Sequence, residues 1–250
     1  MRRLWLAMSV LAFGTVGAAA EEPARQESLE FSVTPYIWLA GVGGDATIGD
    51  RSRAGSADFG DILTDLKFAF MGSAELRYGR FGLVGDFLNF EFKQGVTTPH
   101  NMLFAGGTGS MNATGLALVA LFRAVDDPRF SLDLGAGIRP WWVDTKLHLN
   151  AGLAAARTFS ASDNWTDPIL ALRAHGRLSE QFGLTAYADI GGFNVGSKLT
   201  WQFLATVDWQ LKDWLVFHAG WRYLAFDFEN GERKLDMHMG GPILGATFRF

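Results

Sequence analysis

The chain has 250 residues, of which 48% are hydrophobic and 19% are charged, and its formal net charge is -4 with no cysteine. The absence of cysteine excludes a disulfide framework and thiol or zinc–thiolate chemistry. The mildly acidic balance gives no reason to expect a nucleic-acid partner.

The first twenty residues have the three parts of a secretory signal peptide. Arg2 and Arg3 give a positive start, residues 4–16 are mostly apolar, and three alanines precede Glu21. The apolar run is too short for a transmembrane anchor. We therefore expect cleavage near Ala20 and export of residues 21–250 as one domain, whose formal net charge becomes -6 once Arg2 and Arg3 are lost.

Segments that alternate apolar and polar residues recur along the exported chain, which is the period of a β-strand. Each is about as long as a tilted strand needs to be to cross a membrane. The predicted strands cover residues 29–39, 68–78, 81–93, 112–124, 130–142, 169–178, 182–193, 199–211, 215–228 and 240–250. Pro35 lacks an N–H group, so the first strand is expected to have a bulge or an unpaired position there.

The connections alternate in length. Those at 79–80, 126–128, 179–181 and 212–213 are short, whereas those at 41–67, 94–111 and 143–167 are long and more polar. Short periplasmic turns that alternate with longer outer loops are typical of outer-membrane barrels. The pattern predicts an all-β fold, a closed antiparallel transmembrane β-barrel of about ten strands, although eight or twelve also fit.

A soluble β-sandwich or lipocalin-like barrel is the alternative, in which the apolar rows face inward. Here the polar rows are rich in small residues, and the apolar rows end in tryptophan and tyrosine. That distribution favours lipid on the outside and a crowded polar interior.

The last strand places Phe248 and Phe250 on one apolar row and ends the chain on an aromatic residue. It resembles the assembly signal of bacterial outer-membrane β-barrels. The resemblance implies a location in the bacterial outer membrane. The implied partners are membrane lipid and, through this strand, the barrel assembly machinery.

Charged residues fall on the rows expected to face inward. Isolated charges in a narrow interior would be costly, so the near-balance of acids and arginines predicts mutual pairing that fills the barrel. The same residues would otherwise line a narrow channel. The predicted luminal charge network comprises Glu75, Arg77, Asp86, Asp133, Arg139, Arg173, His175, Arg177, Asp189, Asp208, His218 and Arg222, with Glu30, Tyr187 and Arg249 on the same rows.

The first long connection contains a helical pattern over residues 56–66. Phe59, Ile62, Leu63 and Leu66 have the spacing of one helix face, and Asp58 is a natural N-cap. We expect a short amphipathic helix that plugs the barrel mouth, lies on the outer leaflet, docks a partner or packs its own loop.

Catalytic motifs such as G-x-S-x-G and H-E-x-x-H are absent from the sequence. A surface hydrolase of this architecture would carry acids and histidines at its outer rim, but no nucleophile–base spacing selects among the candidates. The histidines occur singly, so neither a metal nor a cofactor is expected. The rim candidates are Asp144, His148, Asp163, Asp167, Asp227, Asp236 and His238.

Several segments together resemble a widespread group of uncharacterised Gram-negative outer-membrane β-barrel proteins. Lys198 stands where the group carries an acid. The resemblance implies fold and location but no activity. The segments are residues 34–39 (TPYIWL) with Gly41 and Gly44, 59–63 (FGDIL), 165–169 (WTDPI), 188–197 (ADIGGFNVGS) and 220–224 (GWRYL).

The sequence therefore predicts a non-enzymatic barrel with a structural or surface-interaction role. A narrow, porin-like passive channel for ions or small solutes is the alternative. A hydrolase acting at the outer leaflet is the third hypothesis.

Overall fold

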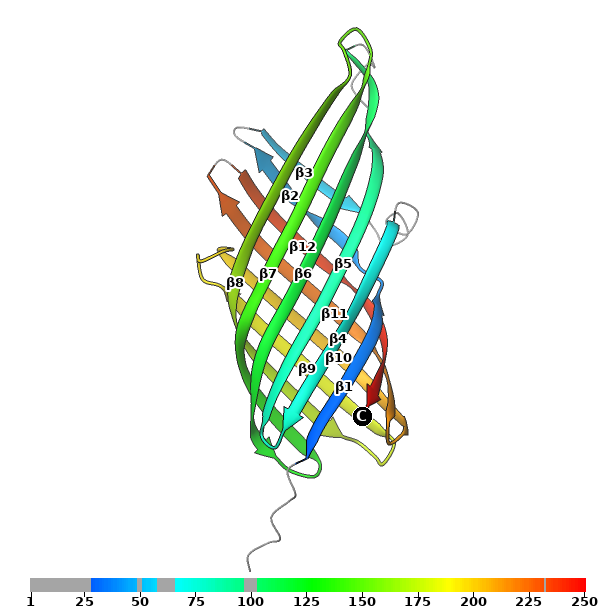
Figure 1. The fold of residues 1–250 in the computed structure, drawn as a ribbon, viewed down its shortest axis with the longest axis vertical. Coiled ribbons are helices and arrows are strands. Elements are labelled where there is room, and N and C mark those ends of the chain that lie inside the picture. Colours follow the sequence, from blue (N-terminus) through cyan, green and yellow to red (C-terminus); the bar gives the residue numbers. More distant parts are fainter. Residues whose placement is uncertain (1–27, 49–50, 58–65, 97–102, 232) are drawn as a thin grey trace, which may run out of the picture.

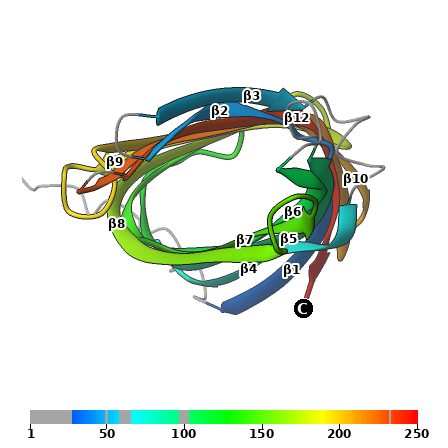
Figure 2. The ribbon, with the colours of Figure 1, turned by 90° about the horizontal axis from the view of Figure 1, so that it is seen from above.

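The computed structural model describes residues 28–48, 51–57, 66–96, 103–231 and 233–250. In these residues one antiparallel sheet closes into a barrel, because β1 pairs with both β4 and β12 (Figures 1 and 2). The predicted closed barrel of ten strands is confirmed. No helix of the described residues could span a membrane. The ten barrel strands are β1 (Leu29–Trp38), β4 (Leu66–Tyr78), β5 (Phe81–Val96), β6 (Phe104–Asp126), β7 (Phe130–Ala151), β8 (Arg157–Arg177), β9 (Phe182–Gly192), β10 (Leu199–Lys212), β11 (Leu215–Asn230) and β12 (Arg233–Arg249).

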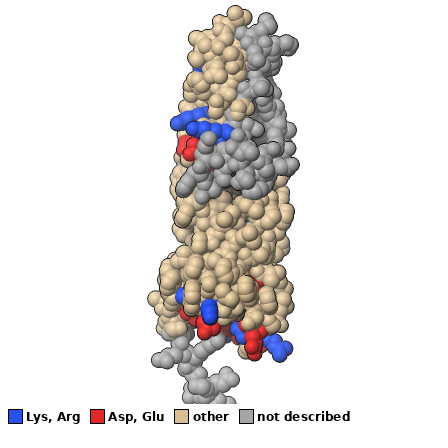
Figure 3. All heavy atoms as spheres, turned by 90° about the vertical axis from the view of Figure 1, so that its right-hand side faces the viewer, with Lys and Arg blue, Asp and Glu red and all other residues tan. Residues whose placement is uncertain are grey.

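The two faces of the sheet differ as the alternation predicts. On β7, Leu134, Ile138 and Trp142 are exposed on the outer face, whereas Asp133 and Arg139 are buried inside. Figure 3 shows an uncharged band between charged regions at different levels of the barrel. An apolar exterior around a polar interior is the arrangement of a transmembrane barrel and the reverse of a soluble one.

Exposed aromatic side chains mark both edges of the apolar band. Trp209 and Phe217 form a tilted pair near one end, with ring centroids 6.0 Å apart, and Trp201 stacks on Tyr223 near the other, at 4.8 Å. Aromatic girdles at two levels are expected where a barrel meets the membrane–water interfaces. We call the end that carries the short turns and the carboxy terminus the short-turn end, and the opposite end the extended end (Figure 1).

The predicted loop at 41–67 is wrong for its first part, which forms a hairpin of β2 (Gly41–Ile48) and β3 (Arg51–Ala57). β1 pairs with β4 only as far as Pro35. Beyond the end of β1, β2 takes its place as the neighbour of β12. Neither row of β3 is apolar, because a strand beyond the membrane has no lipid-facing side.

The predicted loops at 94–111 and 143–167 are also largely wrong. Most of these residues extend β5, β6, β7 and β8, so that β6, β7 and β8 reach 23, 22 and 21 residues. About 9–11 residues suffice to cross a membrane. The three strands are therefore longer than a membrane requires, and Figure 1 shows them reaching beyond the other strands of the barrel.

The helix predicted for residues 56–66 is wrong at both ends. Ser56 and Ala57 end β3, and Leu66 begins β4. Phe59, Ile62 and Leu63 lie outside the described residues. Leu66 fits a helical spacing in the sequence, but its backbone pairs with Phe92 of β5.

Candidate functional site

The interior near the short-turn end contains an ion-pair cluster drawn from β4, β6, β7 and β8. Arg173 donates to Glu75 at 2.6 Å and to Asp133 at 2.7 Å. Arg77 donates to the same two carboxylates, and Arg123 donates to the second oxygen of Asp133 at 3.0 Å. Asp133 is only 2% exposed, and three arginines compensate its burial.

The opposite wall at this level carries a chain of hydrogen bonds centred on Asp208. His218 Nδ1 lies 2.8 Å from Asp208, and Thr185 donates to its other carboxylate oxygen at 2.5 Å. His218 Nε2 is bonded to Thr247 at 2.7 Å, and Thr247 to Thr34 at 2.6 Å across the β1–β12 seam. The histidine chain thus links six strands through Thr34, Thr247, His218, Asp208, Thr185 and His175.

A second level of ion pairs lies above these groups. Arg222 donates to Asp86 at 2.6 Å, to Tyr36 Oη at 2.6 Å and to Gln202 at 2.7 Å. Tyr36 in turn donates to Asp86 at 2.7 Å. The side chains come from β1, β5, β10 and β11, so this group ties together strands that lie far apart in the sequence.

Arg139 forms the companion pair at the same level. It donates to Asp189 at 2.5 Å and to Thr200 at 3.2 Å, and both charged residues are almost fully buried. Thr200 donates onward to the carbonyl of Ala225. A buried pair costs desolvation, which excellent geometry and further hydrogen bonds offset.

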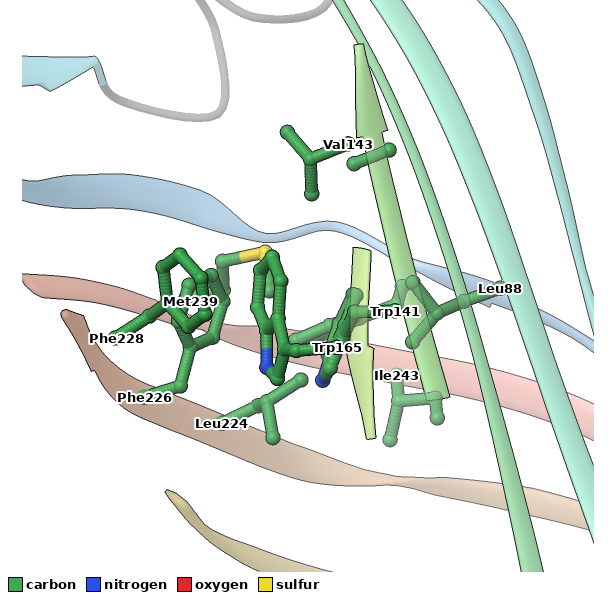
Figure 4. Close-up of a cluster of buried hydrophobic side chains, with 11 residues drawn as sticks. Leu88, Trp141, Val143, Trp165, Leu224, Phe226, Phe228, Met239 and Ile243 are labelled. Carbon is green, nitrogen blue, oxygen red and sulfur yellow. The ribbon is translucent and has the colours of Figure 1, made fainter. Parts of the chain in front are cut away.

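An apolar cluster fills the interior above the ion pairs (Figure 4). Trp165 stacks on Phe228, with ring centroids 4.1 Å apart, and Trp141 contacts Phe226 at 5.3 Å. Aromatic pairs of this kind add to the free energy of burying their surface. The aromatic cluster comprises Trp38, Leu88, Ala113, Trp141, Val143, Trp165, Leu224, Phe226, Phe228, Met239 and Ile243.

The turn after β9 is held in place by hydrogen bonds to the buried side chain of Asp167. The Asp167 carboxylate accepts hydrogen bonds from Ser197 N at 2.5 Å, from Ser197 Oγ at 2.9 Å and from Trp165 Nε1 at 3.2 Å. Phe193 and Asn194 adopt positive φ in this turn. The acid therefore stabilises an unusual backbone path at the edge of the barrel.

The same turn carries Lys198, which pairs with Glu229 near the extended end of β11. Their hydrogen bond raises the pKa of Lys198 above its ordinary value. Glu229 also pairs with Lys234 of β12 at 3.3 Å. Three charged residues thus join the ends of β10, β11 and β12 outside the apolar band.

Little space remains between the ion pairs and the aromatic cluster. A cavity of about 10 Å³ lies there, bordered by Asp86, Arg139, Arg222 and Trp141. That volume is close to what a single water molecule requires. The side chains around this cavity therefore leave little free space between the two levels.

The structure brings together eleven of the twelve residues predicted for the luminal charge network, in the four groups described above. Arg177 is the exception, because it is the last residue of β8 and lies exposed at the short-turn end. Glu30 and Arg249 are exposed at that end as well. A strand position that would face inward in mid-barrel faces solvent where the wall ends.

The rim acids and histidines do not form one site. Asp144 and His148 share the outer face of β7 with Trp142, whereas Asp167 is buried inside the barrel. Asp227 opposes Asp236 on β11 and β12, and it shares the outer face of β11 with Tyr223. Among the described residues no group of three acids or histidines has the geometry of a metal site.

The aromatic cluster and the Asp167 turn were not predicted from the sequence. A signal for the cluster was present, since Trp38 follows Thr34 and Tyr36 on the inward row of β1. The signal for the turn was the pair of segments around Asp167 and Ser197 that carry the family resemblance.

No protein-family model and no curated protein matches the sequence. Among solved structures, the outer membrane protease OmpT from Escherichia coli is similar, with a TM-score of 0.57 and 7% identity over 93% of this chain and 100% of that one. The translocator domain of the autotransporter NalP from Neisseria meningitidis has a TM-score of 0.50 and 14% identity over 91% and 90% of the two chains. At these identities the likeness shows the fold alone.

Proposed function

We propose that this chain is an integral barrel of the bacterial outer membrane with a sealed interior, and that it serves a structural or surface-interaction role without enzymatic activity. The apolar outer band, the two aromatic girdles and the fold shared with outer-membrane proteins support this location. The signal-peptide pattern of residues 1–20 is consistent with export.

The observation that carries the sealed interior is the stacking of the aromatic cluster directly on the Arg222 and Arg139 ion pairs. Arg222 Cζ lies 4.9 Å from the Trp38 ring centroid, and the cavity between the two levels, of about 10 Å³, has room for little more than one water molecule. An ion crossing this region would have to shed its hydration shell among apolar rings. A passive channel is therefore the weaker hypothesis.

A liposome-swelling assay tests the seal. Vesicles that contain the refolded full chain should swell in small sugars no faster than vesicles without protein. Vesicles that contain a known general porin provide the positive control. Swelling that scales with the amount of folded protein would favour the channel.

The scattered rim residues give the hydrolase hypothesis little support. Asp144 and Asp167 lie on opposite faces of the wall, so no single substrate could contact both side chains. The likeness to a protease adds nothing at 7% identity. The extension of β5–β8 beyond the membrane instead offers an outer surface for interaction.

Assembly through the carboxy-terminal strand belongs to the same proposal. Phe250 N donates to the carbonyl of Phe31 at 2.8 Å, and the two rings stack at 5.9 Å. The last residue thus completes the β1–β12 seam. Engagement of this strand by the assembly machinery before closure would leave the seam to form last.

A further inference from the structure

The outer face of the β5–β8 extension carries polar side chains in rows directly above the lipid-facing band. Trp142 is 46% exposed and shares its row with Asn89, Thr114 and Asn164, because residues paired across neighbouring strands share a face. The polar face is thus continuous with the surface that contacts lipid.

Of the next two rows, the first contains two acidic side chains and the second contains two lysines. Glu91 and Asp144 flank Asn112 in the row above Trp142, and Lys93 and Lys146 flank Ser110 in the row after that. Since neighbouring strands lie about 4.8 Å apart, the lysine Cα atoms are roughly 10 Å apart. The small side chain of Ser110 lies between the two cations.

The two lysines are available to an external anion. Lys93 approaches Glu91 only to 4.0 Å, and its side chain is 49% exposed. Lys146 is exposed and forms no ion pair with any described residue. Asp144 is held by Ser162, which donates a hydrogen bond to it.

The height of this face indicates what covers it. His148 lies six positions after Trp142 on β7, which corresponds to about 14 Å along the membrane normal for a strand tilted by about 45°. A phospholipid headgroup layer is only about 5–8 Å thick on each side. A headgroup that contains several sugars would reach the whole face.

We infer that the outer face of β5–β8 binds a phosphorylated glycolipid of the outer leaflet, with Lys93 and Lys146 contacting a phosphate of its sugar headgroup. Asn112 and Asp144 hydrogen-bond sugar hydroxyls in the row below, and Trp142 packs against the sugar nearest the membrane. This inference rests on the proposed placement in the outer membrane.

The test uses the refolded full chain and measures its affinity for lipopolysaccharide that retains its phosphorylated core sugars. The double variant Lys93→Gln/Lys146→Gln should bind about thirtyfold more weakly, given the contribution of each lysine near an anionic headgroup. The matched control Lys212→Gln lies at the short-turn end and should bind like the wild type. Equal affinity of the double variant and the wild type would overturn the inference.

One further variant and one further ligand test which part of the protein and which part of the glycolipid are in contact. Ser110→Trp places a large ring between the lysines without removing charge, and it should also weaken binding. Lipid A without core sugars should bind less well than the full glycolipid, and equal binding would overturn the contact with the core. Conductance by the wild-type protein would contradict the sealed interior while leaving these affinities unaffected, so the two proposals fail separately.

Discussion

Arg222 and Trp38 connect the two kinds of interior in this barrel. The Arg222 guanidinium lies 4.9 Å from the Trp38 ring centroid and donates to Asp86 at 2.6 Å. One cation is thus stabilised both by a carboxylate and by an aromatic ring. The apolar and ionic levels therefore depend on each other for packing.

Removing the cation should leave a buried acid without its partner. We expect Arg222→Ala to lower the free energy of unfolding by about 3–5 kcal/mol, because the largely buried Asp86 carboxylate would lose its cationic partner and retain the Tyr36 hydroxyl as a donor. Urea unfolding in phospholipid vesicles, followed by tryptophan fluorescence, measures this.

The matched control is Arg80→Ala, in the exposed turn between β4 and β5, with an expected change within about 0.5 kcal/mol. Equal losses in the two variants would show that the Arg222 interactions contribute nothing specific.

Gly115 provides the space in which Trp141 lies. A Cβ atom added there would come within 2.8 Å of the Trp141 ring. We expect Gly115→Ala to destabilise the barrel by about 1–3 kcal/mol through overpacking and to alter the near-ultraviolet circular dichroism of the tryptophans.

Gly176→Ala is the comparison for this prediction, since a Cβ atom there meets no other atom within 4 Å. An unchanged spectrum and unchanged stability in Gly115→Ala would contradict the close packing of Trp141 in the aromatic cluster.

Asp167 should control the order of the turn after β9. We expect Asp167→Ala to expose the Ser197 amide, because this substitution removes the acceptor of three hydrogen bonds. Hydrogen exchange at residues 193–197 should accelerate at least tenfold while exchange in β10 stays slow. Uniform acceleration throughout the barrel would instead indicate global destabilisation.

The parts of this fold that the sequence predicts are those where lipid imposes a pattern. On β7, Leu134, Ile138 and Trp142 alternate with Asp133 and Arg139 because one row meets hydrocarbon and the other meets the interior. The strand count and the short turns follow from that pattern. β3 lies beyond the lipid and lacks this pattern, whereas the upper part of β7 reverses it, with Asp144 on the outer face and Val143 buried inside.

The partners inside the barrel depend on information that the sequence pattern does not hold. Arg222 and Asp86 lie 136 positions apart, and their meeting depends on how far each strand is shifted against the next. That stagger is a property of barrel closure. Near-equal numbers of acids and arginines predicted pairing, but not which residues would pair.

Single-channel recording of the refolded full chain in a planar bilayer tests the sealed interior most directly. The stacked ion pairs and aromatic cluster predict no steady conductance above that of the bare membrane, at any moderate voltage of either sign. Reproducible ion-selective steps that require folded protein would contradict the sealed barrel and favour a narrow channel.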